Sequence, residues 1–246
     1  MRVPRIFSRE PLAGRAEIEL DEGASRHLVK VLRLQAGRPL VLFDGHGGEY
    51  RAELAEAGKR ARVRLLGFVE GDRQSPLALT LAIGISRGDR FDWVVQKATE
   101  LGVAQIQPLF TERCEVKLKG ERLEKKVAHW QQVAISACEQ CARNRVPEVS
   151  TPQKFSGYLG DAGADSDLKL VLHHRTEKHL RDLESEHGRP GSALLLVGPE
   201  GGLSAAEIDA ALAQDFLPLR LGPRVLRTET APVAALSVLQ YQWGDL

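Results

Sequence analysis

Cysteine is scarce in this 246-residue chain, which contains Cys114, Cys138 and Cys141 and no others. A small, odd number of cysteines cannot build the disulfide framework that stabilises secreted modules. Long apolar runs are also lacking, since no segment approaches the roughly 18 to 20 apolar residues that a membrane helix requires. The arginines near the N-terminus are followed by no apolar stretch, which argues against a secretory signal peptide. We therefore expect a soluble, cytoplasmic protein.

Net charge is nearly absent as well. Charged residues make up 27% of the chain, but they leave a formal charge of only +1 at pH 7. Overall charge therefore gives no electrostatic argument for nucleic-acid binding, and any RNA-binding surface has to be a local cluster of basic residues. The 43% of hydrophobic residues can fill one large core or two smaller ones, so we expect a folded globular protein.

The N-terminal segment, residues 1–71, has the pattern of short strands separated by turns. Apolar and basic residues alternate over residues 60–66, and the glycine-rich residues 44–48 separate two strand-like runs as a hairpin loop does. One helix interrupts the strands, with Ser25 as its predicted N-cap. Its predicted apolar stripe consists of Leu28, Val31, Leu32 and Leu34. This segment is predicted to be a small β-barrel-like domain.

The pattern changes after the polar residues 71–76, where strands begin to alternate with helices. Strands are predicted at residues 77–85, 103–110, 168–173, 193–197 and 216–221, and helices at residues 89–102, 121–142 and 232–243. Asp89 is the predicted cap of the first of these helices. Alternation of this kind predicts a mostly parallel α/β sheet over residues 72–246, with a ligand site beyond the carboxyl ends of its strands.

The first candidate loop is Gly-Pro-Glu-Gly-Gly at residues 198–202, directly after a predicted strand. Ser204 and Glu207 follow with the spacing of a capping box, which predicts the start of a helix. Glycines allow a ligand to approach the backbone closely. The loop lacks the lysine of a P-loop and the glycine order of a dinucleotide site, and Glu200 would repel phosphate. A cationic or neutral ligand fits it better than a nucleoside triphosphate.

The second candidate loop, residues 221–231, lies between the last predicted strand and the C-terminal helix. Leu221, Val225 and Leu226 are apolar residues within an otherwise polar segment. Apolar walls combined with backbone hydrogen-bonding groups are typical of a small-molecule site. We expect the two loops, at neighbouring strand ends, to form one pocket.

The two loops together closely resemble a known family. The sequences Gly-Pro-Glu-Gly-Gly-Leu-Ser at 198–204, Leu-Gly-Pro-Arg-Val-Leu-Arg-Thr-Glu-Thr-Ala at 221–231 and Trp-Gly-Asp-Leu at 243–246 resemble the RsmE family of bacterial 16S rRNA uridine N3-methyltransferases. Ile-Ser-Arg-Gly at 85–88, Gln-Lys-Ala-Thr-Glu-Leu-Gly at 96–102 and Thr-Glu-Arg-Cys at 111–114 match in the same order. Each match alone is weak, but the ordered set spans nearly the whole chain and is specific.

The resemblance implies a SPOUT-type parallel sheet with a C-terminal trefoil knot over residues 72–246. It implies a PUA-like RNA-binding β-barrel domain over residues 1–71. It further implies a homodimer with its active site near the subunit interface, S-adenosyl-L-methionine as the cofactor, and 16S rRNA or the small ribosomal subunit as the substrate. Neither a metal nor a membrane is implied. Threaded chains are rare, so no periodicity in the sequence could have indicated the knot.

The residues expected to bind the cofactor follow from the resemblance together with the two loops. They are Leu172, His173, Val197, Gly198, Pro199, Glu200, Gly201, Gly202, Leu221, Gly222, Val225, Leu226 and Thr228. Backbone groups of the glycines are expected to bond the adenine and ribose, with Leu172, Val225 and Leu226 around the adenine ring.

Catalysis is expected to depend on Arg227 and Glu200. Arg227 is the candidate for stabilising negative charge on the uracil oxygens, whereas Glu200, Glu229 and an activated water are alternative proton acceptors. A target base in a paired region has to be exposed first. The expected RNA contacts are Arg2, Arg5, Arg9, Arg26, Lys30, Arg33, Arg87 and Arg113, each of which could equally belong to a solvated surface.

The sequence leaves two alternative functions open, a non-catalytic RNA-binding module and a thiol redox protein. Cys138 and Cys141 have the spacing of a redox or zinc motif, but they lie late in a helical pattern with no second cysteine pair, which favours a structural role. His173 and His174 end a strand without the spacing of a metal site. A non-catalytic RNA-binding module would bind RNA but no cofactor, and a thiol redox protein would depend on the two cysteines.

Overall fold

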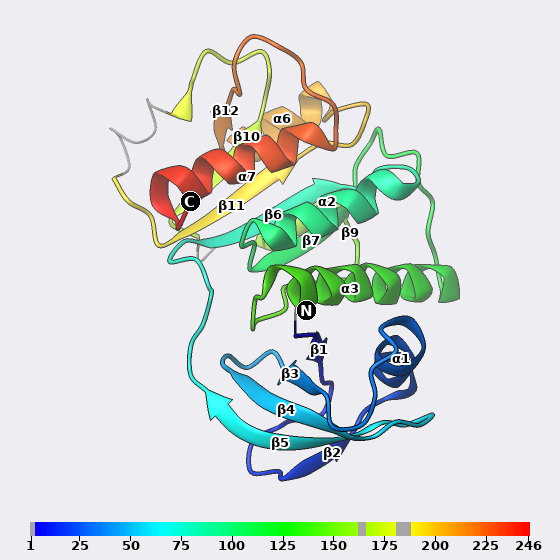
Figure 1. Cartoon of the computed structure of the whole chain (residues 1–246). Coiled ribbons are helices and arrows are strands. Elements are labelled where there is room, and N and C mark those ends of the chain that lie inside the picture. Colours follow the sequence, from blue (N-terminus) through cyan, green and yellow to red (C-terminus); the bar gives the residue numbers. More distant parts are fainter. Residues whose placement is uncertain (1–2, 162–165, 181–187) are drawn as a thin grey trace. The chain divides into compact units, whose positions relative to one another are not determined.

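The computed structural model describes residues 3–161, 166–180 and 188–246, which form two compact units (Figure 1). Unit 1 comprises Met1–Gln74 and Ile135–Val146, and unit 2 comprises Ser75–Ala134 and Pro147–Leu246. The segment Ile135–Val146 belongs to unit 1 although it is distant in sequence. A boundary drawn at one point of the chain, as in the prediction from sequence, cannot represent this grouping.

Unit 1 contains a five-stranded sheet in the order β1-β3-β4-β5-β2. Its strands are β1 (Arg5–Phe7), β2 (Glu17–Glu19), β3 (Pro39–Phe43), β4 (Glu49–Glu56) and β5 (Arg62–Val69). β1 pairs with β3 in parallel, and the other pairs are antiparallel. The glycine-rich residues 44–48 join β3 to β4, as the hairpin pattern predicted.

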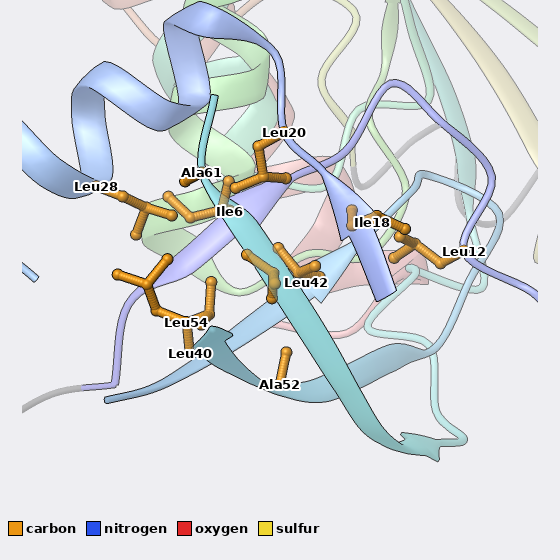
Figure 2. Packing of buried hydrophobic residues seen from close by; sticks show 11 residues of the cluster. Ile6, Leu12, Ile18, Leu20, Leu28, Leu40, Leu42, Ala52, Leu54 and Ala61 are labelled. Carbon is orange, nitrogen blue, oxygen red and sulfur yellow. The ribbon is translucent and has the colours of Figure 1, made fainter. Parts of the chain in front are cut away.

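The core of unit 1 is built from one face of this sheet. Figure 2 shows that Ile6, Leu42 and Leu54, from three different strands, converge in one apolar cluster that the helical segment covers through Leu28. Each of these four side chains is fully buried. Burying a leucine or isoleucine side chain contributes about 1.5–3 kcal/mol, so this cluster accounts for much of the stability of the unit.

The helical segment of unit 1 differs from the prediction. Its N-cap is Asp21, whose side chain accepts hydrogen bonds from the backbone of Gly23 and Ala24, and α1 (Glu22–Arg26) continues into a π-helix, η1 (His27–Val31). Ser25 lies inside α1, where its Oγ accepts a hydrogen bond from Ala61 N at 2.9 Å. Because the π-helical turn changes the periodicity, Val31 is 64% exposed and does not join the core.

Unit 2 contains a parallel sheet of seven strands in the order β12-β10-β11-β6-β7-β8, with β9 also pairing with β7. The strands are β6 (Ala78–Gly84), β7 (Gln105–Phe110), β8 (Glu148–Val149), β9 (Gln153–Lys154), β10 (Leu168–Leu172), β11 (Ser192–Val197) and β12 (Leu217–Leu219). Every pairing in this sheet is parallel, as the alternation of strands and helices predicted.

Helices of unit 2 cover the sheet and connect its strands. They are α2 (Asp89–Glu100), α3 (Glu121–Cys141), whose last residues belong to unit 1, α4 (Phe155–Asp161), α6 (Ala205–Leu212) and α7 (Thr230–Trp243). Leu194 and Leu196 of β11 pack with residues of α4 and α6 in one cluster. On the near side in Figure 1, α2 lies in front of the sheet together with α7, which it contacts.

Two helix starts in unit 2 refine the sequence predictions. The N-cap of α2 is Gly88, with a φ of +61°, and Asp89 is the first helical residue rather than the cap. Pro232 lies in the first turn of α7, where proline is tolerated because its missing N–H has no intrahelical partner there.

A buried glutamine fixes the C-terminal helix within unit 2. Gln240 is fully buried; its Oε1 accepts a hydrogen bond from Ser75 Oγ at 2.6 Å, and its Nε2 donates to Leu101 O at 2.8 Å. A buried amide is stable only when its polar atoms are satisfied, so these contacts hold α7 against the start of β6 and the end of α2.

The described fold confirms a parallel α/β sheet. The knotted threading of the C-terminal segment stays a prediction from the family resemblance. Among the described helices, none combines the length and apolar character needed to cross a membrane.

Candidate cofactor site

Three neighbouring parallel strands end at the same edge of the unit 2 sheet. Leu172 at the end of β10 pairs with Leu219 of β12, and Val171 pairs with Leu196 of β11. The segments that follow these strands therefore lie side by side and enclose a cavity of about 530 Å³. This volume lies within the roughly 300–1,000 Å³ typical of small-molecule sites.

All thirteen residues predicted to bind a cofactor line this cavity. They are Leu172, His173, Val197, Gly198, Pro199, Glu200, Gly201, Gly202, Leu221, Gly222, Val225, Leu226 and Thr228. Further lining residues that the sequence did not indicate include Arg175, Ile208, Asp209, Arg220 and Arg224. Ile208 lies one turn into the helix that the capping box starts, so its periodicity could have identified it.

The first glycine loop is shaped by close backbone contacts. A turn closes it through a hydrogen bond from Gly202 N to Pro199 O at 2.8 Å, and Gly202 has a φ of +68°. A Cβ added to Gly198 would lie 2.6 Å from Leu203 N and 2.7 Å from the carbonyl carbon of Gly202. These are backbone atoms that cannot move aside, so residue 198 has to be glycine for the loop to close.

The predicted capping box is present after this loop. Ser204 Oγ accepts from Glu207 N at 3.2 Å, and a carboxylate oxygen of Glu207 accepts from Ser204 N at 2.9 Å. The other carboxylate oxygen of Glu207 accepts from Glu112 N at 2.8 Å. One nearly buried carboxylate therefore joins the start of α6 to the segment that follows β7.

The second loop contacts the first through Thr228. Its hydroxyl lies 3.2 Å from Ser86 Oγ and 3.5 Å from the carbonyl oxygen of Gly198. Gly222 has a φ of +85°, a backbone conformation that favours glycine. Val225 lines the cavity although it is 77% exposed, so an apolar ligand surface there would cover a side chain that water now contacts.

The Glu200 side chain accepts hydrogen bonds from two arginines. Its Oε1 accepts a hydrogen bond from the backbone N–H of Arg87 at 2.8 Å and another from Arg90 Nη1 at 3.2 Å. Both donors bind the same oxygen, so the carboxylate joins the glycine loop to the segment that follows β6. The geometry therefore favours a role for Glu200 in holding the segment after β6 over its predicted role as a base.

The charges around the cavity are predominantly positive. Arg113, Arg175, Arg220 and Arg224 line it, together with the carboxylates of Glu200 and Asp209. Partial burial lowers the pKa of His173, and the adjacent His174 and Arg175 lower it further. His173 is therefore neutral at pH 7 and adds no further positive charge.

Arg227 does not line the cavity, in contrast to the prediction. It is exposed, and its backbone carbonyl accepts hydrogen bonds from Thr230 N and Ala231 N at the start of α7. Its neighbours Leu226 and Thr228 do line the cavity. Arg113, which the sequence suggested only as an RNA contact, is one of the four arginines that line the cavity.

The residues predicted to contact RNA differ in their exposure to solvent. Arg2 lies outside the described residues. Arg9, Arg26, Lys30, Arg33, Arg87 and Arg113 are exposed. Arg5 is not, because its side chain is 7% exposed, ion-paired with Glu49 and hydrogen-bonded to Asn144 Oδ1 at 2.6 Å. The prediction for Arg5 is therefore corrected: its guanidinium is committed to the interior of unit 1.

The cysteines take no part in the cavity. Cys138 and Cys141 lie on α3, and the pKa of the Cys138 thiol is raised by its interaction with Cys141 and by burial. A raised pKa keeps a thiol protonated and unreactive. Within the residues that the structure describes, no group of three or more histidine, cysteine, aspartate or glutamate side chains could hold a metal ion.

The cavity suits an uncharged aromatic ring attached to a charged tail. Leu172, Leu221 and Leu226 supply apolar surface, and the glycine loop exposes backbone groups for hydrogen bonds. Neither loop provides the nest of donors around a lysine that binds a triphosphate. The lining residues therefore fit S-adenosylmethionine, whose adenine needs apolar walls and whose ribose and amino acid need polar partners.

Comparison with known proteins identifies relatives over the whole chain. A family described as RNA methyltransferase domain matches residues 73–240, and one described as RNA methyltransferase PUA domain matches residues 20–66. Ribosomal RNA small subunit methyltransferase E of Buchnera aphidicola is 33% identical over 246 residues, covering 100% of this chain and 98% of that protein. The protein of the same name from Bacillus subtilis is 34% identical, covering 88% and 86%.

Solved structures give the same result. A Legionella pneumophila protein described as a methyltransferase, in complex with bound SAM, is 43% identical with a TM-score of 0.94. Ribosomal RNA small subunit methyltransferase E from Neisseria gonorrhoeae, bound to S-adenosyl methionine, is 38% identical with a TM-score of 0.90. Both similarities cover 100% of this chain and 100% of the other.

Proposed function

The chain belongs to the ribosomal RNA small subunit methyltransferase E family, and we propose that it transfers a methyl group from S-adenosylmethionine to N3 of a uridine in 16S ribosomal RNA. The observation that carries this proposal is that all thirteen predicted cofactor residues line one cavity at the carboxyl ends of β10, β11 and β12. Ligands of open α/β sheets bind at this edge.

The cofactor is held by the two loops. Gly198, Gly201 and Gly202 would offer backbone groups to its polar parts, whereas Leu172 and Leu226 would supply apolar surface for the adenine ring. When bound, S-adenosylmethionine supplies an electrophilic methyl group. The protein's own contribution is to orient the acceptor base, exclude water and stabilise charge.

The uracil N3–H has to lose its proton before or during transfer. Glu200 is bound by two donors, so we assign proton removal to water and give Glu200 a positioning role. Arg227 does not line the cavity, so we propose no charge-stabilising role for it.

RNA binding is assigned to exposed basic residues. Arg26, Lys30 and Arg33 lie on or beside α1 and η1, and all three are exposed. Contacts to phosphates set affinity and its salt dependence, not the choice of base. Replacing any one of them with alanine is expected to lower the salt slope of RNA binding by about one.

The test of the function is a methylation assay on a defined substrate. Small ribosomal subunits, and separately their purified 16S RNA, are taken from a strain whose gene for this protein is deleted, then incubated with the protein and S-adenosylmethionine. Mass spectrometry of the nucleosides is expected to detect one 3-methyluridine per RNA. The subunit and naked-RNA arms identify which form is the substrate.

Two outcomes would overturn the proposal. A methylated nucleoside other than 3-methyluridine would contradict the assignment of the acceptor atom. No methyl transfer to either substrate, by protein that binds S-adenosylmethionine in calorimetry, would contradict the assignment of 16S RNA.

We further propose that the protein acts in the cytoplasm as a homodimer. Val238 and Tyr241 of α7 are exposed, Tyr241 to 75%, and a second copy would remove them from water. Size-exclusion chromatography with light scattering is expected to give twice the mass of the chain. Tyr241→Lys is expected to shift the mass to that of one chain, whereas Leu66→Lys, at an exposed position of unit 1, leaves it unchanged. A monomeric wild-type protein would refute the dimer.

A further inference from the structure

The residues that line the cavity come from strand ends on both sides of β11. Leu172 ends β10, and Leu221 and Leu226 belong to the loop that follows β12. Along the sheet, β11 separates these strands from β6 and β7. Arg113 follows β7 and therefore reaches the cavity from the opposite side.

Arg113 is attached to the glycine loop by two kinds of contact. Its Nη1 donates a hydrogen bond to the carbonyl oxygen of Gly201 at 2.8 Å. Its aliphatic stem packs on the same glycine, since a Cβ added to Gly201 would lie 3.0 Å from Arg113 Cβ and 3.3 Å from Cδ. The guanidinium is thereby held at the edge of the cavity with its other N–H groups still able to donate.

Arg113 also differs from neighbouring arginines in its ion pairing. Arg87 forms an ion pair with Glu115, and Arg90 forms one with Glu200. Arg113 forms no ion pair with any residue that the structure describes; its hydrogen-bond partner is a neutral carbonyl. A guanidinium whose charge is not offset by a carboxylate can stabilise negative charge on a ligand.

The other cavity arginines are less suited to the acceptor. Arg175 follows β10, and Arg220 and Arg224 come from the β12 side, so all three lie on the side of the apolar walls. Arg220 in addition donates its Nε to Gly222 O at 3.0 Å. Arg113 alone among these four comes from the β7 side.

Resting on the proposed function, we propose that Arg113 binds the carbonyl oxygens of the acceptor uracil and stabilises the negative charge that develops on them. In the step it serves, the N3–H bond breaks and its proton passes to water. The electron pair left on N3 forms the bond to the methyl carbon, and the pair of the breaking carbon–sulfur bond stays on sulfur. The charge delocalised over the uracil oxygens before transfer is the charge that the guanidinium lowers in energy.

The test compares Arg113→Ala and Arg113→Lys with Arg122→Ala, which removes an exposed arginine of α3 outside the cavity. For Arg113→Ala, kcat on small subunits is expected to fall about 10²- to 10³-fold, as for loss of one charge-stabilising donor. The affinity for S-adenosylmethionine, measured by calorimetry, stays within about threefold of the wild type. The pH at which kcat reaches half of its plateau moves upward, because the uracil proton is lost less readily without the guanidinium.

A readout independent of turnover is binding of the substrate RNA in the presence of S-adenosylhomocysteine. Arg113→Ala weakens this binding, Arg113→Lys has an intermediate effect because lysine keeps the charge but not the paired donors, and Arg122→Ala changes neither binding nor kcat. Circular dichroism checks that each variant is folded. If Arg113→Ala does not fold, the comparison of Arg113→Lys with the wild type tests the proposal instead.

The results that would contradict the role of Arg113 differ from those that would contradict the proposed function. Arg113 variants that form 3-methyluridine at wild-type kcat, or that lose cofactor affinity with unchanged kcat at saturation, overturn the assignment of Arg113 while the function stands. Wild-type protein that forms no 3-methyluridine overturns the function itself.

Discussion

The backbone N–H of Arg87 donates a hydrogen bond to Glu200 Oε1 at 2.8 Å. The two residues are far apart in sequence, Arg87 after β6 and Glu200 in the glycine loop after β11. The bond therefore joins two segments at the carboxyl edge of the sheet, and Arg90 adds a second donor to the same oxygen.

Replacing Glu200 distinguishes a positioning residue from a base. In Glu200→Gln the amide oxygen still accepts from Arg87 N but loses the charge that attracts Arg90, so we expect kcat to fall about tenfold or less and the pH profile of kcat to keep its shape. Glu200→Ala removes both bonds and is expected to be worse. Loss of the pH-dependent rise in kcat in the glutamine variant would instead identify Glu200 as the proton acceptor.

The shape of the first loop is tested at Gly198. In Gly198→Ala the new methyl group would overlap backbone atoms of Gly202 and Leu203, so we expect a loss of about 1–3 kcal/mol in stability and of most cofactor affinity. Gly222→Ala is the matched control: its φ of +85° carries strain of roughly 1–2 kcal/mol, but nothing lies within 4 Å of the added Cβ. Thermal unfolding and calorimetry measure both. Equal cofactor affinity in Gly198→Ala and the wild type would contradict the tight loop.

The buried ion pair of unit 1 predicts opposite behaviour for two N-terminal arginines. Arg5→Ala leaves Glu49, which is 18% exposed, without its main partner, so we expect destabilisation of about 3–5 kcal/mol. Arg9 is largely exposed and its contact with Asp21 is 4.0 Å long, so Arg9→Ala changes stability by less than about 1 kcal/mol. Denaturant unfolding compares them. Equal stability of the two variants would show that the Arg5 network is not structural.

Acidification is expected to weaken cofactor binding through His173. Its pKa is lowered from the ordinary 6.5 by partial burial, His174 and Arg175, against an opposing effect of Asp209. The folded protein therefore binds this proton less readily than the unfolded chain, so stability decreases as the pH falls below about 6.5. Protonation also adds positive charge beside a sulfonium ligand. Calorimetry between pH 5.5 and 8 is expected to show affinity falling at acidic pH, and falling less in His173→Gln. Identical pH dependence in both proteins would contradict this role.

The parts of the fold that follow local rules could be predicted from the sequence. Residues 193–197 of β11 are a continuous apolar run because both faces of a parallel sheet are covered, and the Ser204 and Glu207 spacing identified the start of α6. The short strands β8 and β9, of two residues each, could not be found. Their pairing is decided by the neighbouring strand β7 and not by their own sequence.

The candidate site was predictable to a similar extent. The cofactor residues cluster in two loops. Glycines in the first loop, and apolar residues within the otherwise polar second loop, indicated them in the sequence. Arg113 and Arg227 show what could not be predicted from the sequence. Each is an arginine in a loop segment, and the path of the backbone decides that Arg113 lines the cavity and Arg227 does not. The π-helical turn at His27–Val31 likewise moved Val31 out of the predicted apolar stripe, because one extra residue per turn cannot be read from a hydrophobic pattern.

Glu207 has a kinetic consequence for ligand capture. Its two carboxylate oxygens hold Ser204 N and Glu112 N, so the segment leading from Gly198 into α6 is ordered before any ligand arrives. The conformational entropy of that segment is lost during folding, and the incoming molecule does not have to order it again. Association is therefore expected to proceed in a single phase whose rate rises linearly with ligand concentration, without the plateau that a slow rearrangement would impose.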